Sequence, residues 1–168
     1  MPTQALDIRD TATLRAGRMA VIFERRGDRI AHRVVYSADG DNEQLLLESI
    51  EGQPDESWPA SPPLQEGRIE STGGRDVAML IGMAGKSHWS VSIEADAEHE
   101  SLTFDVACRV KEPGGRLASS YRIGDTQNVR LASVENCRKV EQPNQLVLES
   151  ELHADVPATV RWKYIVTM

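Results

Sequence analysis

The chain lacks several features that identify a class of function. It has two cysteines in 168 residues, Cys108 and Cys137, and their spacing makes neither a disulfide framework nor a CxxC metal site,. No stretch approaches the roughly 18 apolar residues of a membrane-spanning helix, and the N-terminus lacks the apolar segment of a secretion signal. We therefore expect a cytoplasmic protein with no membrane partner, unless a leader has been removed.

Aromatic residues and clustered basic residues are also scarce. Aromatic side chains make up 5% of the chain, which disfavours a carbohydrate-binding surface lined with rings,. The net charge is −7, and residues 37–100 hold three basic residues against fourteen acidic ones. A phosphate-backbone partner needs clustered Lys and Arg, so we expect no nucleic-acid partner. We interpret Arg25, Arg26 and Arg29, the one local basic excess, as solvated turn charges.

A Gly-Lys-Ser string at residues 85–87 resembles the end of a phosphate-binding loop, but the rest of that motif is missing. The motif needs a glycine five residues earlier, where Leu80 stands, and a helix after the lysine,. Residues 88–94 instead alternate between apolar and polar side chains. That period of two predicts a half-buried β-strand, so this stretch indicates a β-hairpin and not a nucleotide site.

The features that are present indicate an all-β protein. The 40% hydrophobic and 27% charged residues are typical of a globular domain, and short alternating segments recur with turn residues between them,. We predict an antiparallel two-sheet β-sandwich or jelly-roll-like domain of about ten strands. A closed up-and-down β-barrel of lipocalin size is the alternative. Residues 1–17 are expected to be an arm or lead-in strand and 18–168 a single domain, with a Pro-rich loop at 52–63.

Loop parity predicts which neighbouring strands pair. A two-residue Gly27-Asp28 turn sets Val21 beside Val34 and Phe23 beside His32, which makes His32 a packed strand histidine. Similar reasoning pairs residues 102–111 with 117–123, and residues 145–152 with 158–166, where Glu149 would face Arg161. Cys108 alternates with apolar residues and is expected to be a buried small side chain.

For residues 75–94, parity favours an odd loop around Ala84, Gly85 and Lys86. Three or five loop residues place Met79 and Ile81 on the same inward face as Trp89 and Val91. The second face then carries Leu80 with His88 and Ser90.

The Pro-rich segment GQPDESWPASPP holds four of the eight prolines and cannot lie in the interior of a sheet,. Its Trp58 has two interpretations that the sequence leaves open. It is either a lid folded over an open end of the core or an aromatic platform for a ligand or a second subunit.

We predict a non-enzymatic ligand-binding or protein-assembly module. Its candidate ligand-binding residues are Trp58, Leu80, His88 and Ser90, with no catalytic residue, metal ligand or cofactor assigned. We also expect a homodimer formed through an edge strand or the Trp58 loop, and a small-molecule ligand as the other possible partner.

Two alternative functions rest on histidines. A hydrolase-type enzyme would use His88 with Ser87 or Ser90, oriented by Glu94 or Asp76, although neighbours on opposite strand faces do not meet that geometry. A metal site would need His32, His88, His99 and His153 to converge from four separate segments.

Overall fold

The computed structural model describes residues 4–40, 42–124, 128–151 and 155–168, which form β-strands joined by turns and loops. The strands are β1 (Gln4–Asp7), β2 (Thr11–Ala16), β3 (Met19–Arg26), β4 (Arg29–Ser37), β5 (Glu43–Ser49), β6 (Glu66–Thr72), β7 (Arg75–Ala84), β8 (Ser87–Asp96), β9 (Ser101–Val110), β10 (Ala118–Ile123), β11 (Arg130–Glu135), β12 (Cys137–Gln142), β13 (Gln145–Ser150) and β14 (Ala158–Thr167). Within the described ranges, no helix is long and apolar enough to cross a membrane.

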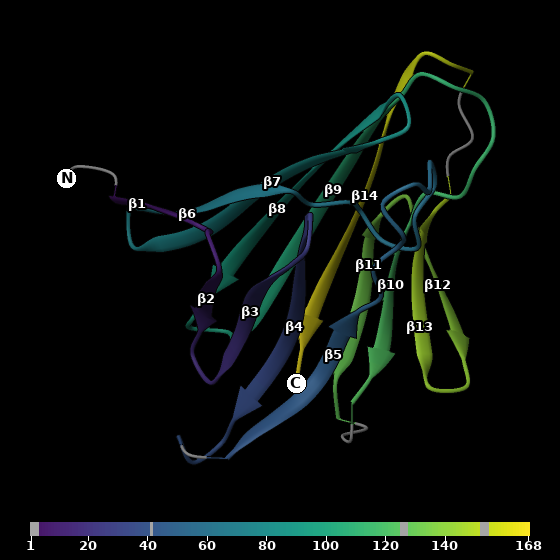
Figure 1. Cartoon of the computed structure of the whole chain (residues 1–168). Helices are drawn as coiled ribbons and strands as arrows, with labels where there is room; N and C mark the ends of the chain where they lie inside the picture. Colours follow the sequence, from purple (N-terminus) through teal and green to yellow (C-terminus); the bar gives the residue numbers. More distant parts are fainter. Residues whose placement is uncertain (1–3, 41, 125–127, 152–154) are drawn as a thin grey trace.

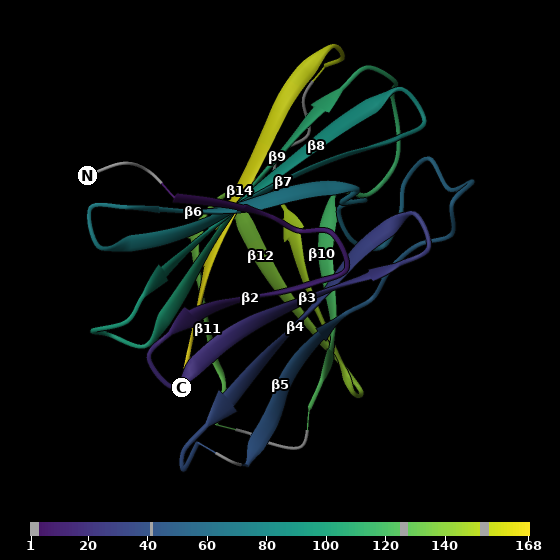
Figure 2. The ribbon, with the colours of Figure 1, turned by 60° about the vertical axis from the view of Figure 1, so that its left-hand side comes forward.

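The strands form two antiparallel sheets of seven strands each, which pack face to face (Figures 1 and 2). Sheet A has the order β1-β6-β7-β8-β9-β14-β11, and sheet B has the order β12-β13-β10-β5-β4-β3-β2. The two sheets are not closed into one barrel. The predicted sandwich is therefore confirmed, and the described residues hold fourteen strands in place of about ten.

The path of the chain ties the two sheets together. Strands β2–β5 form a meander in sheet B, and β6–β9 form a second meander in sheet A. The chain crosses between sheets at both lateral edges, from β1 to β2 at one and from β11 to β12 at the other (Figure 1). The core lies between the sheets, and its largest fully buried side chains are Trp162, Tyr121, Tyr164, Phe23 and Phe104.

The hairpin of β3 and β4 forms as predicted. Val21 pairs with Val34 and Phe23 with His32, across the two-residue turn Gly27-Asp28. Gly27 has a φ of 63°, the conformation that a glycine adopts at the first position of such a turn,. The His32 ring lies 6.4 Å from the Phe23 ring, as expected for a packed strand histidine.

Two other predicted hairpins are wrong, because their strands belong to different sheets. Strand β9 pairs with β8 and β14, whereas β10 pairs with β5 and β13. Strand β13 pairs with β12 and β10, so it faces β14 across the core without pairing with it. Glu149 consequently binds Arg116 and Arg138, and Arg161 binds Asp105.

The predicted odd loop between β7 and β8 is also wrong. Ala84 pairs with Ser87, so the turn is the two-residue Gly85-Lys86, and Gly85 has a φ of 56°. Every residue of β7 therefore takes the opposite face from the one predicted. Trp89 and Val91 point inward as expected, but their partners are Gly82 and Leu80.

Two edge strands lie within residues 4–16. Strand β1 pairs with β6 in sheet A, and β2 pairs with β3 in sheet B. Arg25 fixes the crossover between them, because its side chain donates to the carbonyl oxygens of Arg9 (2.8 Å) and Gln65 (3.0 Å). Arg29 is only 4% exposed, so the interpretation of this group as solvated turn charges holds for Arg26 alone.

Candidate functional site

The Pro-rich loop covers one end of the sandwich and is held by hydrogen bonds. Ser61 Oγ donates to the carbonyl oxygen of Ser120 and accepts its N–H, both at 3.0 Å. The Ser120 hydroxyl donates to the carbonyl oxygen of Ala60 at 2.7 Å. These contacts attach the loop to Ser120 of β10, just beyond the pairing of Tyr121 with Ser49, the last residue of β5. They hold residues 60 and 61, which follow Trp58 closely in the chain.

Trp58 is half-buried and packs against the end of the core. Its indole lies edge-on to Trp89, with ring centroids 6.2 Å apart and an angle of 71° between the rings. The backbone of Gly115 lies against the ring so closely that an added Cβ would come within 2.0 Å of it. The expectation that Trp58 folds over an open end of the core therefore agrees with its packing.

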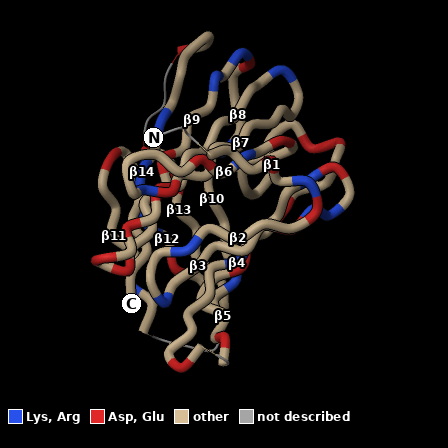
Figure 3. Tube along the Cα trace, turned by 90° about the vertical axis from the view of Figure 1, so that its left-hand side faces the viewer, with Lys and Arg blue, Asp and Glu red and all other residues tan. Residues whose placement is uncertain are grey.

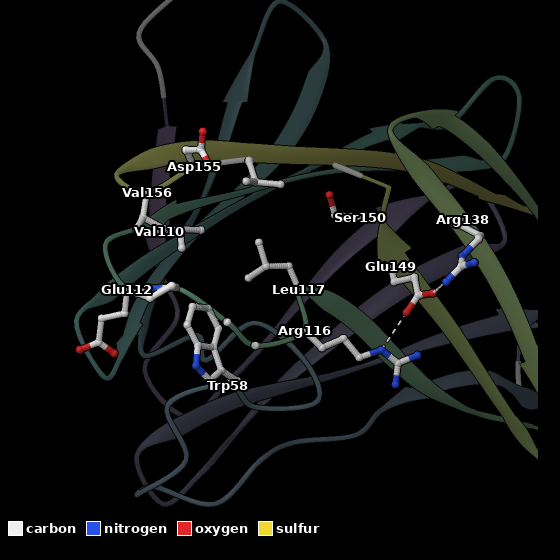
Figure 4. Close-up of a pocket in the computed structure, with 14 residues that line it drawn as sticks. Trp58, Val110, Glu112, Arg116, Leu117, Arg138, Glu149, Ser150, Asp155 and Val156 are labelled. Carbon is white, nitrogen blue, oxygen red and sulfur yellow. Dashed lines mark hydrogen bonds and ion pairs between the residues drawn. The ribbon is translucent and has the colours of Figure 1, made fainter. Parts of the chain in front are cut away.

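A pocket of about 500 Å³ opens beside Trp58, within the range of small-molecule sites (Figure 4),. We call it the Trp58 pocket. It is lined by Trp58, Val110, Glu112, Pro113, Gly114, Gly115, Arg116, Leu117, Arg138, Glu149, Ser150, Asp155, Val156 and Val160. In Figure 4 the acidic Glu112 and Asp155 lie on one side, the arginines on the other, and Leu117 and Trp58 between them. The pocket thus has an apolar middle with charges of opposite sign at its two sides.

The basic side is built around Glu149, which is 9% exposed. Its carboxylate accepts from Arg116 Nε at 2.8 Å and from an Arg138 terminal nitrogen. Burial alone would raise the pKa of Glu149, but the hydrogen bonds and the positive charges of Arg138 and Arg116 together outweigh burial and hold that pKa below its ordinary value,. Two guanidinium groups on one carboxylate leave one net positive charge.

Solvent reaches both arginines, whose side chains are 52% and 65% exposed. On the acidic side, Glu112 is paired with Lys86 at 3.3 Å. Figure 3 shows basic and acidic positions interspersed around the molecule as a whole. The excess of positive charge at this side of the pocket is therefore a local feature.

The four ligand-binding candidates from the sequence do not come together. Trp58 lines the pocket just described, whereas Leu80 is 1% exposed in the core. His88 and Ser90 lie on the outer face of sheet A and line a separate hollow of about 410 Å³ with Ile81 and Met83. The sequence prediction puts Leu80 on the same face as His88 because it assumes an odd number of residues in the β7–β8 turn, which has two.

The sequence did not predict four residues of the Trp58 pocket as part of a site: Gly115, Arg116, Arg138 and Glu149. The predicted pairing of residues 102–111 with 117–123 leaves Gly115 and Arg116 in a hairpin loop, and the predicted register sets Glu149 opposite Arg161. The signal that remains in the sequence is the Glu-Pro-Gly-Gly-Arg run at 112–116, because Gly115 (φ 91°) leaves room for a ring against the backbone,.

Of the two serines in the hydrolase alternative, Ser87 faces away from His88, whereas Ser90 lies on the same outer face as His88 but has no oriented carboxylate beside it in the described part of the chain. Ser87 is 1% exposed and faces the core, while His88 faces outward. Glu94 accepts from Arg75 at 2.5 Å and Asp76 accepts from Ser71 at 2.5 Å, so both carboxylates are engaged elsewhere. The arrangement does not build a nucleophile with an oriented base.

The histidines that the structure describes are also separated. His32 lies in the core, His88 lies on the outer face of sheet A, and His99 sits in the β8–β9 turn, where it binds Asp96. His153 is outside the described residues. Over the described part of the chain, no group of three or more His, Cys, Asp or Glu side chains is placed to hold a metal ion.

A second polar cluster crosses the core. His32 Nε2 and the Tyr121 hydroxyl lie 2.9 Å apart, and the hydroxyls of Tyr121 and Tyr164 lie 2.6 Å apart. Since Tyr164 belongs to sheet A and the other two to sheet B, this chain of hydrogen bonds joins the sheets. Burial lowers the pKa of His32 to about 4 and raises the pKa of both tyrosines,.

The two cysteines are free and buried. Cys108 is 0% exposed, which confirms its predicted role as a small core residue, and burial raises the pKa of its thiol to about 12. No family model, curated protein or solved structure matches this chain.

Proposed function

We propose that the protein is a non-enzymatic binding module whose Trp58 pocket takes a small organic anion with an apolar body. The observation that carries this proposal is a half-buried indole beside an exposed pair of arginines that share one carboxylate. The indole and the aliphatic wall favour an apolar body, and the single net positive charge of the side formed by Arg116, Arg138 and Glu149 favours an anionic head group there,.

The pocket is built for holding a ligand in one place. Its Trp58 is fixed from one side by Gly115 and edge-on by Trp89, so binding costs little side-chain entropy,. Arg116 and Arg138 are oriented by Glu149 before any ligand arrives. Free Cys108 and Cys137 are compatible with the cytoplasmic residence expected from the sequence,.

The experiment is a titration with two ligands of equal length and different charge, decanoate and 1-decanol, detected by tryptophan fluorescence and calorimetry. We expect Trp58→Ala to weaken both. We expect Arg116→Gln to weaken the binding of decanoate by roughly tenfold and to leave the affinity for decanol unchanged. The reason is that a hydrogen bond to a charged group contributes about 1.5 kcal/mol.

Two neighbouring glycines supply a matched control. Both have positive φ, 87° at Gly114 and 91° at Gly115, so alanine brings similar backbone strain to either,. A Cβ at Gly114 meets nothing within 4 Å, whereas one at Gly115 meets the Trp58 ring. Gly115→Ala should therefore reduce binding more strongly than Gly114→Ala. Equal decanoate affinity in wild type, Trp58→Ala and Gly115→Ala would rule the site out.

A further inference from the structure

The outer face of sheet A carries an exposed apolar stripe along β7. The buried positions of this strand are Ala78, Leu80, Gly82 and Ala84. The alternate positions Met79, Ile81 and Met83 therefore point to the outside. Ile81 is 55% exposed and Met83 is 46% exposed. Their neighbours on β8, Ser90 and His88, are also exposed. This stripe forms the floor of the 410 Å³ hollow.

Two charged residues flank the stripe, one on each side. Glu66 on β6 lies beside Ile81, and Arg109 on β9 lies beside His88, which in turn is the partner of Met83. Both line the hollow. Neighbouring strands are about 4.8 Å apart, so roughly 14 Å separates β6 from β9, too far for Glu66 and Arg109 to pair within one chain.

On strands β6–β9 the other charges of this face are already paired, whereas Lys163 on the neighbouring β14 has no ion-pair partner among the described residues. Arg68 binds Glu70 at 2.8 Å and Arg161 binds Asp105 at 2.7 Å. Within the described part of the chain, Glu66 and Arg109 have no ion-pair partner, and Arg109 makes only a long hydrogen bond of 3.4 Å to Thr159. Strands β6–β9 thus offer one unpaired acid and one unpaired base on opposite flanks of an apolar centre.

We propose that this face binds the same face of a second copy of the chain. A two-fold axis parallel to the strands and midway between β7 and β8 brings β6 of one copy over β9 of the other. Glu66 of each copy then meets Arg109 of the other, and Ile81 and Met83 fill the centre. The two charges are offset by two residues along the strands, about 7 Å, which an extended arginine side chain spans.

The size of the face suits a stable dimer. Strands β6, β7, β8 and β9, which this axis brings over one another, make a surface about 19 Å wide, and ten residues of a strand are about 34 Å long,. The product, about 650 Å² from each copy, gives a total of about 1,300 Å², within the range of stable interfaces. The two edge strands of sheet A are weaker alternatives, because β1 has four residues and β11 has a register shift between Ser133 and Glu135.

Charge reversal tests the pairing directly. Analytical ultracentrifugation of the full chain should show a dimer for the wild type. Glu66→Arg or Arg109→Glu alone should raise the dimer dissociation constant by about tenfold or more, because each places like charges together twice in the dimer. The double variant should restore dimerisation. Glu141→Arg, an exposed reversal on β12 of the other sheet, is the control and should leave the dimer unchanged.

Three results would overturn the proposal: a wild type that is monomeric at millimolar concentration, a dimer indifferent to both reversals, or a double variant no better than the singles. Thermal unfolding of each variant at low concentration shows whether the monomer still folds. Because the Trp58 pocket lies at the loop end and not on this face, ligand binding and dimerisation can fail independently.

Discussion

His32 is a titratable group enclosed by aromatic rings. The rings of Tyr121, Phe104 and Phe23 lie 5.4, 5.8 and 6.4 Å from it, and its Nδ1 has no hydrogen-bond partner in the described structure. Its Nε2 bond to Tyr121 is compatible with a neutral ring, and burial disfavours the charged form. The hydrogen-bonded chain between the sheets therefore contains a group whose protonation opposes folding.

This burial makes stability depend on pH. The unfolded chain protonates His32 near its ordinary pKa of 6.5, whereas the folded chain does so only near a pKa of about 4. The free energy of unfolding should therefore fall as pH drops from about 6.5 to about 4, by up to about 3 kcal/mol from this residue. Glu51, whose pKa is raised by burial, acts in the opposite direction.

The comparison of wild type with His32→Gln isolates the histidine, because other groups titrate equally in both. Urea unfolding at pH 7 and pH 5 should show a smaller loss of stability in His32→Gln. Glutamine keeps a polar group near Tyr121, so the variant should still fold at pH 7. The same loss in both proteins would show that His32 titrates normally in the folded state.

The β7–β8 hairpin shows how a neighbouring segment determines the face of a strand. Gly82 faces inward opposite Trp89, and the carbonyl oxygen of Pro63 lies where its Cβ would be, at 1.5 Å. The segment leading to β6 is attached to the same strand, because the Gln65 N–H donates to the carbonyl oxygen of Ile81 at 2.8 Å. This close approach permits only glycine at position 82.

Alanine substitutions at Gly67 in β6 and at Gly82 in β7 should differ sharply in the stability that they cost. A Cβ at Gly82 meets a backbone carbonyl at 1.5 Å, so the backbone must move, and we expect a loss of about 3 kcal/mol or more,. A Cβ at Gly67 meets the Leu80 side chain at 2.8 Å, which can shift at a cost of about 1–2 kcal/mol,. Thermal and urea unfolding of Gly67→Ala and Gly82→Ala measure both. Equal losses would contradict the close approach.

The whole molecule depends on strands that are distant in sequence. Strand β14 pairs with β9 along nine residues and with β11 on its other side, and it buries Val160, Trp162, Tyr164 and Val166. Strand β14 also carries Tyr164, whose hydroxyl is the sheet A partner in the hydrogen bonds that run from His32 through Tyr121. Strand β14 thus joins β9 and β11, two strands that precede it in the sequence and are not paired with each other.

Removing β14 should prevent folding. A chain that stops after Pro157 exposes the edge of β9 and loses four buried core residues of β14, and we expect it to lack a cooperative unfolding transition by circular dichroism. The control is a chain that starts at Ile8, which removes only β1, whose four residues are all exposed. That control should keep a cooperative transition. A cooperative transition without β14 would refute its central role.

Much of the local structure could be predicted from the sequence. Alternation located most strands, because a half-buried strand needs one apolar face whatever its partner is. The β3–β4 register was predictable because Gly27-Asp28 fixes a two-residue turn, and turn length then sets every pair along the hairpin,. Trp58 was found as a candidate because prolines keep its segment out of a sheet.

Only the tertiary structure decided which strands pair and which residues meet. Alternation identifies a buried face but not a partner, so β9 and β10 look like a hairpin although they lie in different sheets. The Trp58 pocket depends on those crossovers, since Arg116 and Arg138 meet at Glu149 from separate segments. In β7 the larger apolar residues point outward because Pro63 crowds the inner side at Gly82, a contact between segments that no local pattern encodes.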